Sequence, residues 1–242
     1  MAEDDQHEAH RPWRSLLFAP ANRPELTAKL PRSGPDAVVL DLEDAVPEGA
    51  KGEARAAARA TIGVLAALEG GPAVVVRVNG TRTPWFTEDL DEALADGLHS
   101  VIVPKLESAD EVAAVRGALD ERGWRGVGLI AGIETALGVA DARAVLAEGV
   151  AGAYFGAEDF VADMGGVRTP GNAEVAHARA HVALASRLAG VPVLDMVVAD
   201  FGDADRFDRE AAEARALGFT GKLCIHPAQV PLANAAFVPS AD

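Results

Sequence analysis

The sequence predicts a (β/α)8 TIM barrel, that is, a parallel eight-stranded closed sheet surrounded by helices. The first observation is that eight short β-rich runs alternate with helix-length amphipathic segments. The second is that these runs are apolar on both faces, which is typical of parallel strands shielded on both sides. The third is the length of 242 residues, which a single barrel domain commonly occupies. A doubly wound open sheet is the alternative, because periodicity does not show closure.

Each predicted strand is a short apolar run, and most of these runs end at a charged or polar residue or at a turn. In order along the chain, the predicted strands are residues 15–19, 37–42, 73–78, 100–104, 127–133, 153–155, 193–198 and 222–225. Segments rich in Ala and Leu with charges on one side are suited to covering helices, and they span residues 51–68, 88–95, 109–121, 137–148, 173–188 and 206–217. Ser108 and Asp141 are expected to cap helix N-termini, and Gly190 and Gly218 to follow helix ends in a left-handed conformation.

Composition limits the domain organisation and the partners. We expect a disordered acidic tail at residues 1–12 and one barrel domain over residues 13–242. The 22 Lys and Arg residues against 37 Asp and Glu residues give a net charge of −15, which argues against a nucleic-acid partner because phosphate binding needs a basic surface. Cys224 is the only cysteine, which indicates a reducing compartment, and we expect the cytoplasm. The sequence has no signal-peptide h-region and no membrane-length apolar stretch.

Ionisable residues follow the predicted strands. The carboxyl ends of all barrel strands meet at one rim, so these residues can converge although they are far apart in sequence. The rim residues are Asp41, Glu43, Asp44, Arg77, Asn79, Lys105, Glu107, Glu134, Glu158, Asp159, Asp195, Asp200 and His226. Carboxylate ligands without a Cys or His pair suit Mg²⁺, or else Mn²⁺, better than Zn²⁺. The competing interpretation is that these acids pair with Arg77 or Lys105 or cap helices.

The segment Gly156-Ala157-Glu158-Asp159 has small residues that let a ligand approach the backbone, and N–H groups at a helix start favour a carboxylate. A plain tight turn is the alternative. His177 and His181 have a spacing that can bind metal, but they lack the Glu of a zincin motif, so we do not expect ligation. No dinucleotide or P-loop fingerprint is present. Cys224 is expected to be a buried structural thiol.

Seven blocks along the chain together resemble a known family. They are RSLLFAP at 14–20 with NRP at 22–24, VLDLEDAV at 39–46, VRVN at 76–79 followed by TPW at 83–85, PK at 104–105, IETA at 133–136, GAED at 156–159 and CIHP at 224–227. In this order they resemble the citrate lyase β-subunit-like proteins of the HpcH/HpaI aldolase superfamily. The resemblance covers residues 14–238.

The resemblance implies a TIM barrel, usually a homotrimer, that cleaves or forms a carbon–carbon bond in a 3-hydroxyacyl thioester such as citryl-, malyl- or citramalyl-CoA. It implies that Glu134 and Asp159 hold Mg²⁺ and that Arg77 contacts the substrate carboxylate or oxyanion. The backbone amides around Gly156 and Ala157 are implied to receive the keto acid, with Glu158 in the same loop. Arg23 and Lys105 lie in the same signature blocks, and the resemblance gives them less definite substrate-binding roles.

One departure from the family pattern affects the expected activity. Many relatives continue past the Ile-His-Pro block into a helical segment with a Gly-x-Met-Val/Ile-Asp motif, whose Asp assists thioester chemistry in a neighbouring subunit. The sequence ends at Asp242 without that motif, so we do not expect activities that depend on the Asp. Two alternatives stay open: a metal-dependent aldolase that acts on free hydroxy-keto acids, and a non-catalytic subunit that binds a keto acid.

Overall fold

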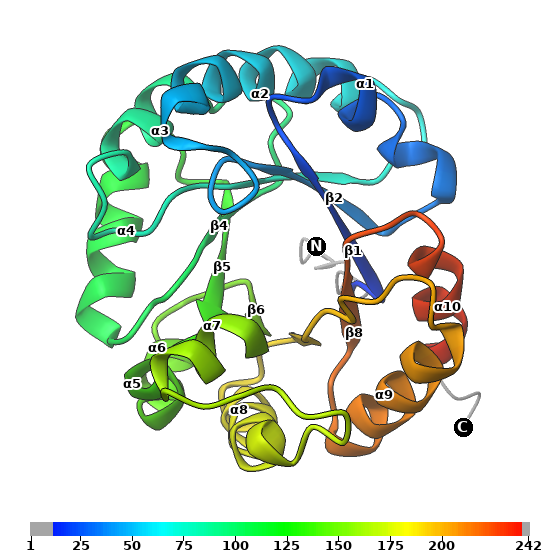
Figure 1. Ribbon diagram of the computed structural model, residues 1–242. Coiled ribbons are helices and arrows are strands. Elements are labelled where there is room, and N and C mark those ends of the chain that lie inside the picture. Colours follow the sequence, from blue (N-terminus) through cyan, green and yellow to red (C-terminus); the bar gives the residue numbers. More distant parts are fainter. Residues whose placement is uncertain (1–11, 239–242) are drawn as a thin grey trace, which may run out of the picture.

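The computed structural model describes residues 12–238, and these residues form a closed parallel barrel (Figure 1). The strands are β1 (Ser15–Pro20), β2 (Ala37–Asp41), β3 (Ala73–Arg77), β4 (Ser100–Val103), β5 (Gly128–Ile133), β6 (Gly152–Phe155), β7 (Val193–Asp195) and β8 (Gly221–Cys224). They follow one another around the barrel in sequence order, and Leu16 of β1 pairs with Leu223 of β8 to close it. The predicted fold class is confirmed, and the open-sheet alternative is excluded.

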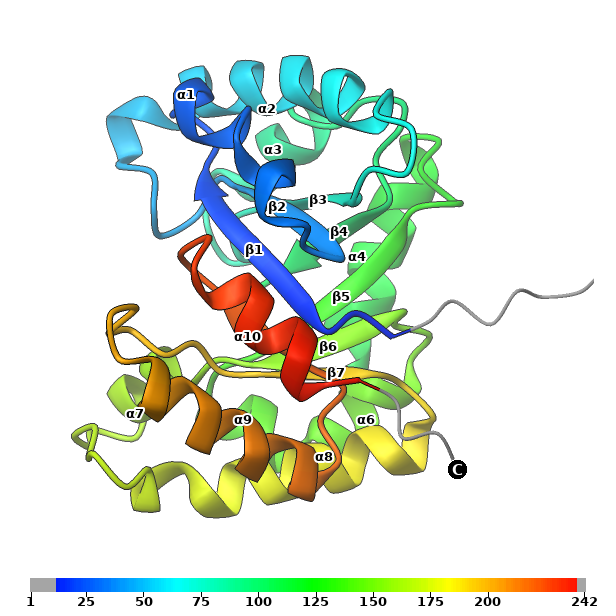
Figure 2. The same ribbon diagram turned by 90° about the vertical axis from the view of Figure 1, so that its right-hand side faces the viewer.

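Helices form a ring around the barrel, as Figures 1 and 2 show from two directions. The α-helices are α1 (Pro24–Thr27), α2 (Lys51–Ala66), α3 (Phe86–Glu92), α4 (Ala109–Glu121), α5 (Ala136–Ala140), α6 (Ala142–Ala147), α7 (Ala157–Asp163), α8 (Ala176–Ala189), α9 (Ala204–Leu217) and α10 (Gln229–Ala236). Short 3₁₀ turns are η1 (Leu30–Ser33), η2 (Glu48–Ala50) and η3 (Ala173–Val175). Figure 2 shows α10 lying beside β1, which agrees with its close contacts to β1 and β8.

The helix punctuation is largely as predicted. Ser108 accepts a hydrogen bond from the Glu111 amide at 3.2 Å and so caps α4. Gly190 and Gly218 follow α8 and α9 with φ of +70° and +98°, a left-handed conformation that glycine adopts without a steric penalty. Asp141 does stand before α6, but its side chain makes no capping bond. The predicted helix at 137–148 is in fact two helices that separate at this residue.

The strand predicted at 193–198 is wrong in length, because β7 ends at Asp195. The reason lies in the backbone carbonyl groups that follow it. Lys222 Nζ donates a hydrogen bond to the Met196 carbonyl at 2.9 Å, and Gln229 Nε2 donates one to the Val198 carbonyl at 2.8 Å. Side chains therefore satisfy these groups in place of a neighbouring strand, and the segment leaves the sheet early.

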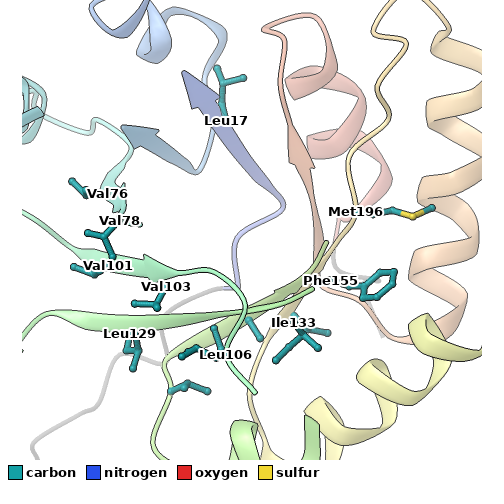
Figure 3. Close-up of a cluster of buried hydrophobic side chains, with 14 of the residues drawn as sticks. Leu17, Val76, Val78, Val101, Val103, Leu106, Leu129, Ile133, Phe155 and Met196 are labelled. Atoms are coloured by element: carbon teal, nitrogen blue, oxygen red, sulfur yellow. The ribbon is translucent and has the colours of Figure 1, made fainter. Parts of the chain in front are cut away.

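Alternating strand residues build two separate apolar layers. Inside the barrel lies a smaller cluster that contains Leu16, Val39, Val75, Ile102, Ile130, Tyr154, Leu194 and Leu223. Between the strands and the helices lies the larger cluster, part of which Figure 3 shows, including Leu17, Val76, Val101, Leu129, Ile133 and Phe155. Because side chains alternate along a strand, the parity of a residue decides whether it faces the barrel interior or the helices.

Two further predictions concern the ends of the chain and the membrane. The expected disordered tail at 1–12 lies, apart from residue 12, outside the described residues, as does the end of the expected domain beyond residue 238. Within residues 12–238, none of the helices has the length and apolar character that crossing a lipid bilayer requires.

Candidate active site

A cavity of about 440 Å³ lies at the carboxyl ends of the strands. It is lined by Phe18, Ala19, Pro20, Asp41, Asp44, Ala45, Arg77, Glu134, Tyr154, Gly156, Ala157, Glu158, Asp159, Val197, Leu223 and Ile225. This is the end of a TIM barrel at which catalytic residues are found. The predicted convergence of charged residues from distant parts of the sequence is therefore observed, with charged members from β2, β3 and α7 and from the segments that follow β2 and β5.

Arg77, at the end of β3, is fixed by a two-point ion pair. Its Nε and Nη2 atoms donate hydrogen bonds to the two carboxylate oxygens of Asp41 at 2.7 and 2.8 Å. Asp41 also accepts hydrogen bonds from the backbone amides of Glu43 and Ala45. Burial works to lower the pKa of the Arg77 guanidinium, but the charge and hydrogen bonds of Asp41 outweigh it and hold this pKa well above the ordinary value. The guanidinium is thus a permanent, oriented cation in the wall of the cavity.

Lys105 links the carboxylates of the pocket. Its Nζ donates a hydrogen bond to Glu43 at 2.8 Å, and it lies 3.3 Å from Asp159 and 3.8 Å from Glu134. Its backbone has φ of +56°, a left-handed conformation that is uncommon for a residue other than glycine and costs about 1–2 kcal/mol. Burial works to lower the pKa of Lys105, but Glu43 and the other two carboxylates raise it overall, so the ammonium stays charged.

Glu134 and Asp159 share this one pocket, since one oxygen of each lies within ion-pair distance of the same nitrogen. Glu134 follows β5 and is only 2% exposed. Burial, and next the charge of Glu43, raise its pKa to about 8. Asp159 stands in the first turn of α7 and its side chain is 37% exposed. One carboxylate is therefore deep in the pocket and the other is open to solvent.

The arrangement fits a magnesium ion. Oε2 of Glu134 is buried and has no hydrogen-bond partner among residues 12–238, although a buried carboxylate oxygen normally has one. An added Cβ atom at Gly156 would come within 2.7 Å of Glu134 Cγ, so the glycine leaves the room that this side chain occupies. Within the same residues no three His, Cys, Asp or Glu side chains form a metal cage. Two carboxylates are nevertheless enough for Mg²⁺, which keeps several waters and uses substrate oxygens.

The loop after β6 supplies other predicted residues. Gly156 N–H is already donated to the Ile133 carbonyl at 3.0 Å, so the first backbone amide that could meet a ligand is that of Ala157. Glu158 lines the cavity, but its carboxylate accepts a hydrogen bond from Arg168 at 2.9 Å. Gly156 and Glu158 are therefore engaged within the protein, and Ala157 keeps a backbone amide at the start of α7 for the predicted ligand.

Some predicted residues lie elsewhere. Arg23 pairs with Glu25 at 2.5 Å, its side chain is more than half exposed, and it does not line the cavity. Asp195 is not at the rim: it is buried on the outer side of the barrel, where it pairs with Arg179 at 3.0 Å and with Lys222 at 2.7 Å. Asp195 directly follows Leu194, whose side chain faces the interior, so the side chain of Asp195 points outward.

The remaining weak signals have structural roles. Cys224 is fully buried, and burial raises the pKa of its thiol to about 12, as expected of an unreactive cysteine. His177 and His181 stack on α8 with ring centroids 6.1 Å apart, and neither lines the cavity. Sequence analysis missed Tyr154, an interior residue of β6 that lines the cavity. Its place two residues before Gly156 could have indicated that it points to the same side of the strand.

Comparisons with known proteins agree with this geometry. The HpcH/HpaI aldolase/citrate lyase family model matches residues 14–227, which is most of the chain. The chain belongs to this family. It is 51% identical over 230 residues to a citrate lyase subunit beta-like protein of Deinococcus radiodurans, covering 94% of this chain and 80% of that protein. It is 31% identical over 254 residues to the mitochondrial citramalyl-CoA lyase of Homo sapiens, covering 98% and 74%.

A solved structure is similar over almost its whole length. The citrate lyase beta subunit of Mycobacterium tuberculosis, complexed with oxaloacetate and magnesium, has 36% sequence identity and a TM-score of 0.80, with 94% of this chain and 98% of that chain covered. The resemblance read from the seven sequence blocks is therefore confirmed. As a member of this family, the chain is an enzyme of the carbon–carbon lyase class.

Proposed function

We propose that the chain catalyses Mg²⁺-dependent cleavage or formation of the carbon–carbon bond in a 3-hydroxyacyl thioester such as citryl-, malyl- or citramalyl-CoA, with a keto acid and acetyl-CoA as the products of cleavage. The observation that carries this proposal is the pair Glu134 and Asp159 in one cavity, where Glu134 Oε2 makes no hydrogen bond within residues 12–238. Support for the substrate class comes from the relatives, of which one is a citramalyl-CoA lyase and another was solved with oxaloacetate and magnesium.

In this proposal the carboxylates of Glu134 and Asp159 hold the metal ion, Mg²⁺ first and Mn²⁺ as the alternative. When bound, a divalent cation polarises the substrate oxygens and lowers the pKa of the hydroxyl group whose proton must leave before the carbon–carbon bond breaks. Lys105 faces both carboxylates and Glu43, so its ammonium offsets the negative charge that these three groups bring together. It also contributes a cation that an anionic substrate needs in a protein of net charge −15.

Arg77 is assigned the stabilisation of developing negative charge on the substrate. Its orientation is fixed before the substrate arrives, because Asp41 holds two of its nitrogen atoms and Nη1 lies 3.0 Å from Glu43. A donor that needs no reorganisation is worth about 3 kcal/mol, or about a hundredfold in rate. The Ala157 amide at the start of α7 is assigned to the keto-acid carboxylate. Arg23 is assigned the outer part of the substrate, because its side chain is in solvent near the end of β1.

The contacts of the three carboxylates that follow β2 support one of them as the proton acceptor. Asp41 is fully engaged with Arg77 and with two backbone amides, and Glu43 is held by Lys105. Asp44 lines the cavity with a side chain that is 58% exposed and lies 3.8 Å from Arg77. Of the three carboxylates that follow β2, Asp44 is therefore the one that is free to accept a proton, either directly or through a water molecule. We also propose that the protein assembles as a homotrimer and acts in the cytoplasm.

The test is a turnover assay with malyl-CoA, citramalyl-CoA and citryl-CoA in the presence of Mg²⁺. Glu134→Gln and Asp159→Asn should each reduce turnover by at least about a hundredfold and abolish its metal dependence, while circular dichroism stays unchanged. Glu121→Gln, at the exposed end of α4, is the matched control and should behave as wild type. Wild-type turnover with normal metal dependence in either active-site variant would refute the assignment.

The same assay separates the alternatives. Turnover of free hydroxy-keto acids, or condensation of pyruvate with an aldehyde, without activity on any thioester would indicate an aldolase. Mg²⁺-dependent binding of oxaloacetate in a calorimeter, without product from any of these compounds, would indicate a binding subunit. Replacing Mg²⁺ by Mn²⁺ after treatment with a chelator shows whether both ions serve.

A further inference from the structure

Tyr154 packs inside the barrel in a space that a glycine on the neighbouring strand leaves open. In the register of β5 and β6 it stands opposite Gly132. A Cβ atom at Gly132 would lie 2.8 Å from the Tyr154 hydroxyl oxygen and 3.0 Å from its ring carbon Cζ. Because Gly132 has no side chain, the tyrosine ring can extend from β6 over β5, and its hydroxyl lies above Gly132.

The hydroxyl is an unusual feature of this position. Tyr154 is 2% exposed and belongs to the apolar interior cluster, yet its oxygen makes no hydrogen bond of good geometry among residues 12–238, and Glu134 is an acceptor placed beside it. A buried hydroxyl without a partner is unfavourable, whereas a phenylalanine would fill the same space without that loss. Packing alone thus gives no reason for a tyrosine at this position.

Glu134 lies next to this hydroxyl. It comes two residues after Gly132 along β5, so it faces the same interior side one step closer to the rim. Gly156, two residues after Tyr154 on the neighbouring strand, leaves room for the Glu134 carboxylate in the way that Gly132 leaves room for the tyrosine. A tyrosine hydroxyl carries its proton at neutral pH and can therefore act as a donor to this carboxylate. Within residues 12–238, neither the phenol oxygen nor Glu134 Oε2 makes a hydrogen bond of good geometry, so each is available to the other.

We propose that Tyr154 is a positioning residue: its hydroxyl donates a hydrogen bond to the carboxylate of Glu134 when that carboxylate holds the metal ion, and so fixes the orientation of the ligand. This inference rests on the proposed function, because it assigns Glu134 to the metal. A carboxylate ligand has lone pairs left after it binds a metal, and a neutral donor can satisfy one of them without adding charge. Arg77 donates to Asp41, and Lys105 donates to Glu43 and stands 3.8 Å from Glu134, so the Tyr154 hydroxyl is the neutral donor beside this carboxylate.

The first experiment compares Tyr154→Phe with wild type by calorimetric titration with Mg²⁺. Loss of a hydrogen-bond partner behind a metal ligand costs about 10- to 100-fold in affinity, and we expect a weakening in this range. Thermal unfolding of the metal-free variant should occur at or above the wild-type temperature, because the substitution removes an unpartnered buried hydroxyl. Phe155→Leu is the matched control: it changes the next side chain of β6, which faces the helices, and should leave Mg²⁺ affinity unchanged.

The second experiment reads the hydroxyl directly and does not depend on how a variant folds. Tyr154 is the only tyrosine in the chain, so biosynthetic replacement by 3-fluorotyrosine gives a single fluorine resonance. Addition of Mg²⁺ should shift this resonance in the wild-type background and leave it in place in Glu134→Gln.

The outcomes separate this inference from the function on which it rests. If wild type binds Mg²⁺ and Glu134→Gln does not, but Tyr154→Phe binds as wild type and the resonance does not move, the metal site stands and the role of Tyr154 is refuted. If Glu134→Gln binds Mg²⁺ as wild type does, the proposed metal site is refuted and the inference falls with it. A weakened Tyr154→Phe together with a metal-dependent shift supports the role.

Discussion

The affinity for Mg²⁺ should depend strongly on pH, because the buried carboxyl of Glu134 has a pKa of about 8. The prediction concerns the Mg²⁺ affinity measured as the pH is raised from 6 to 9. Burial favours the neutral form of this carboxyl, so below pH 8 the group is mostly protonated in the folded, metal-free protein. A metal ion binds only the ionised form, and metal and proton therefore compete.

The magnitude follows from the pKa. At pH 7 about one carboxyl in ten is ionised, so the observed affinity should lie about tenfold below its plateau, and at pH 6 about a hundredfold below it. The affinity should rise through pH 7 and level off above pH 8 to 9. A carboxylate with a lowered pKa would behave differently: it would already be ionised at pH 6, and its metal affinity would not change between pH 6 and 9.

The assay is calorimetric titration with Mg²⁺ at several pH values, in pairs of buffers with different ionisation enthalpies. At pH 7 the difference between the buffers should report release of nearly one proton for each ion bound. The pH dependence should be absent from the residual binding of Glu134→Gln, which has no proton to lose. A wild-type affinity that stays constant between pH 6 and 8, without proton release, would refute the reasoning about burial.

The remaining predictions concern packing and ion pairs. Gly156→Ala should reduce Mg²⁺ affinity at least about tenfold without unfolding the protein, because the new methyl group would displace the Glu134 carboxylate. Gly117→Ala is its control: an added Cβ there meets no atom within 4 Å and should stabilise α4 by about 0.5–1 kcal/mol in urea unfolding, with unchanged affinity. Asp41→Asn should lower the free energy of unfolding by about 3–5 kcal/mol, because it removes the two-point counter-charge of the buried Arg77 and leaves only the ion pairs with Glu43 and Asp44. A loss below about 1 kcal/mol would show that solvent or another carboxylate already compensates this cation.

The fold could be predicted because its signals are local. The segments 37–42 and 73–78 are short, apolar and β-rich, and segments such as 109–121 carry a helical pattern with a capping serine at 108. The observed strands agree with those predictions within one or two residues, except β7. Its early end depends on bonds from Lys222 and Gln229 to its backbone, which come from later parts of the chain and leave no local signal.

The candidate site was predicted in part. Their positions after predicted strands indicated that four residues share one rim, and the structure places all four around one cavity or in contact with it. They are Arg77, Lys105, Glu134 and Asp159. The same reasoning placed Asp195 at the rim, which is wrong, because the side chain faces the helices. A residue at a strand end can point inward or outward, and only the register of the closed sheet decides which.

By itself the sequence determined the repeating strand and helix pattern, the excess of acidic residues and the blocks that identify the family. These depend on neighbours along the chain, which the order of residues specifies directly. Only the tertiary structure decided which carboxylates are paired and which oxygens, such as Glu134 Oε2, make no hydrogen bond among the described residues. Burial and partnership are set by side chains that meet between strands, such as Tyr154 of β6 beside Glu134 after β5, and the register of the sheet decides which side chains meet.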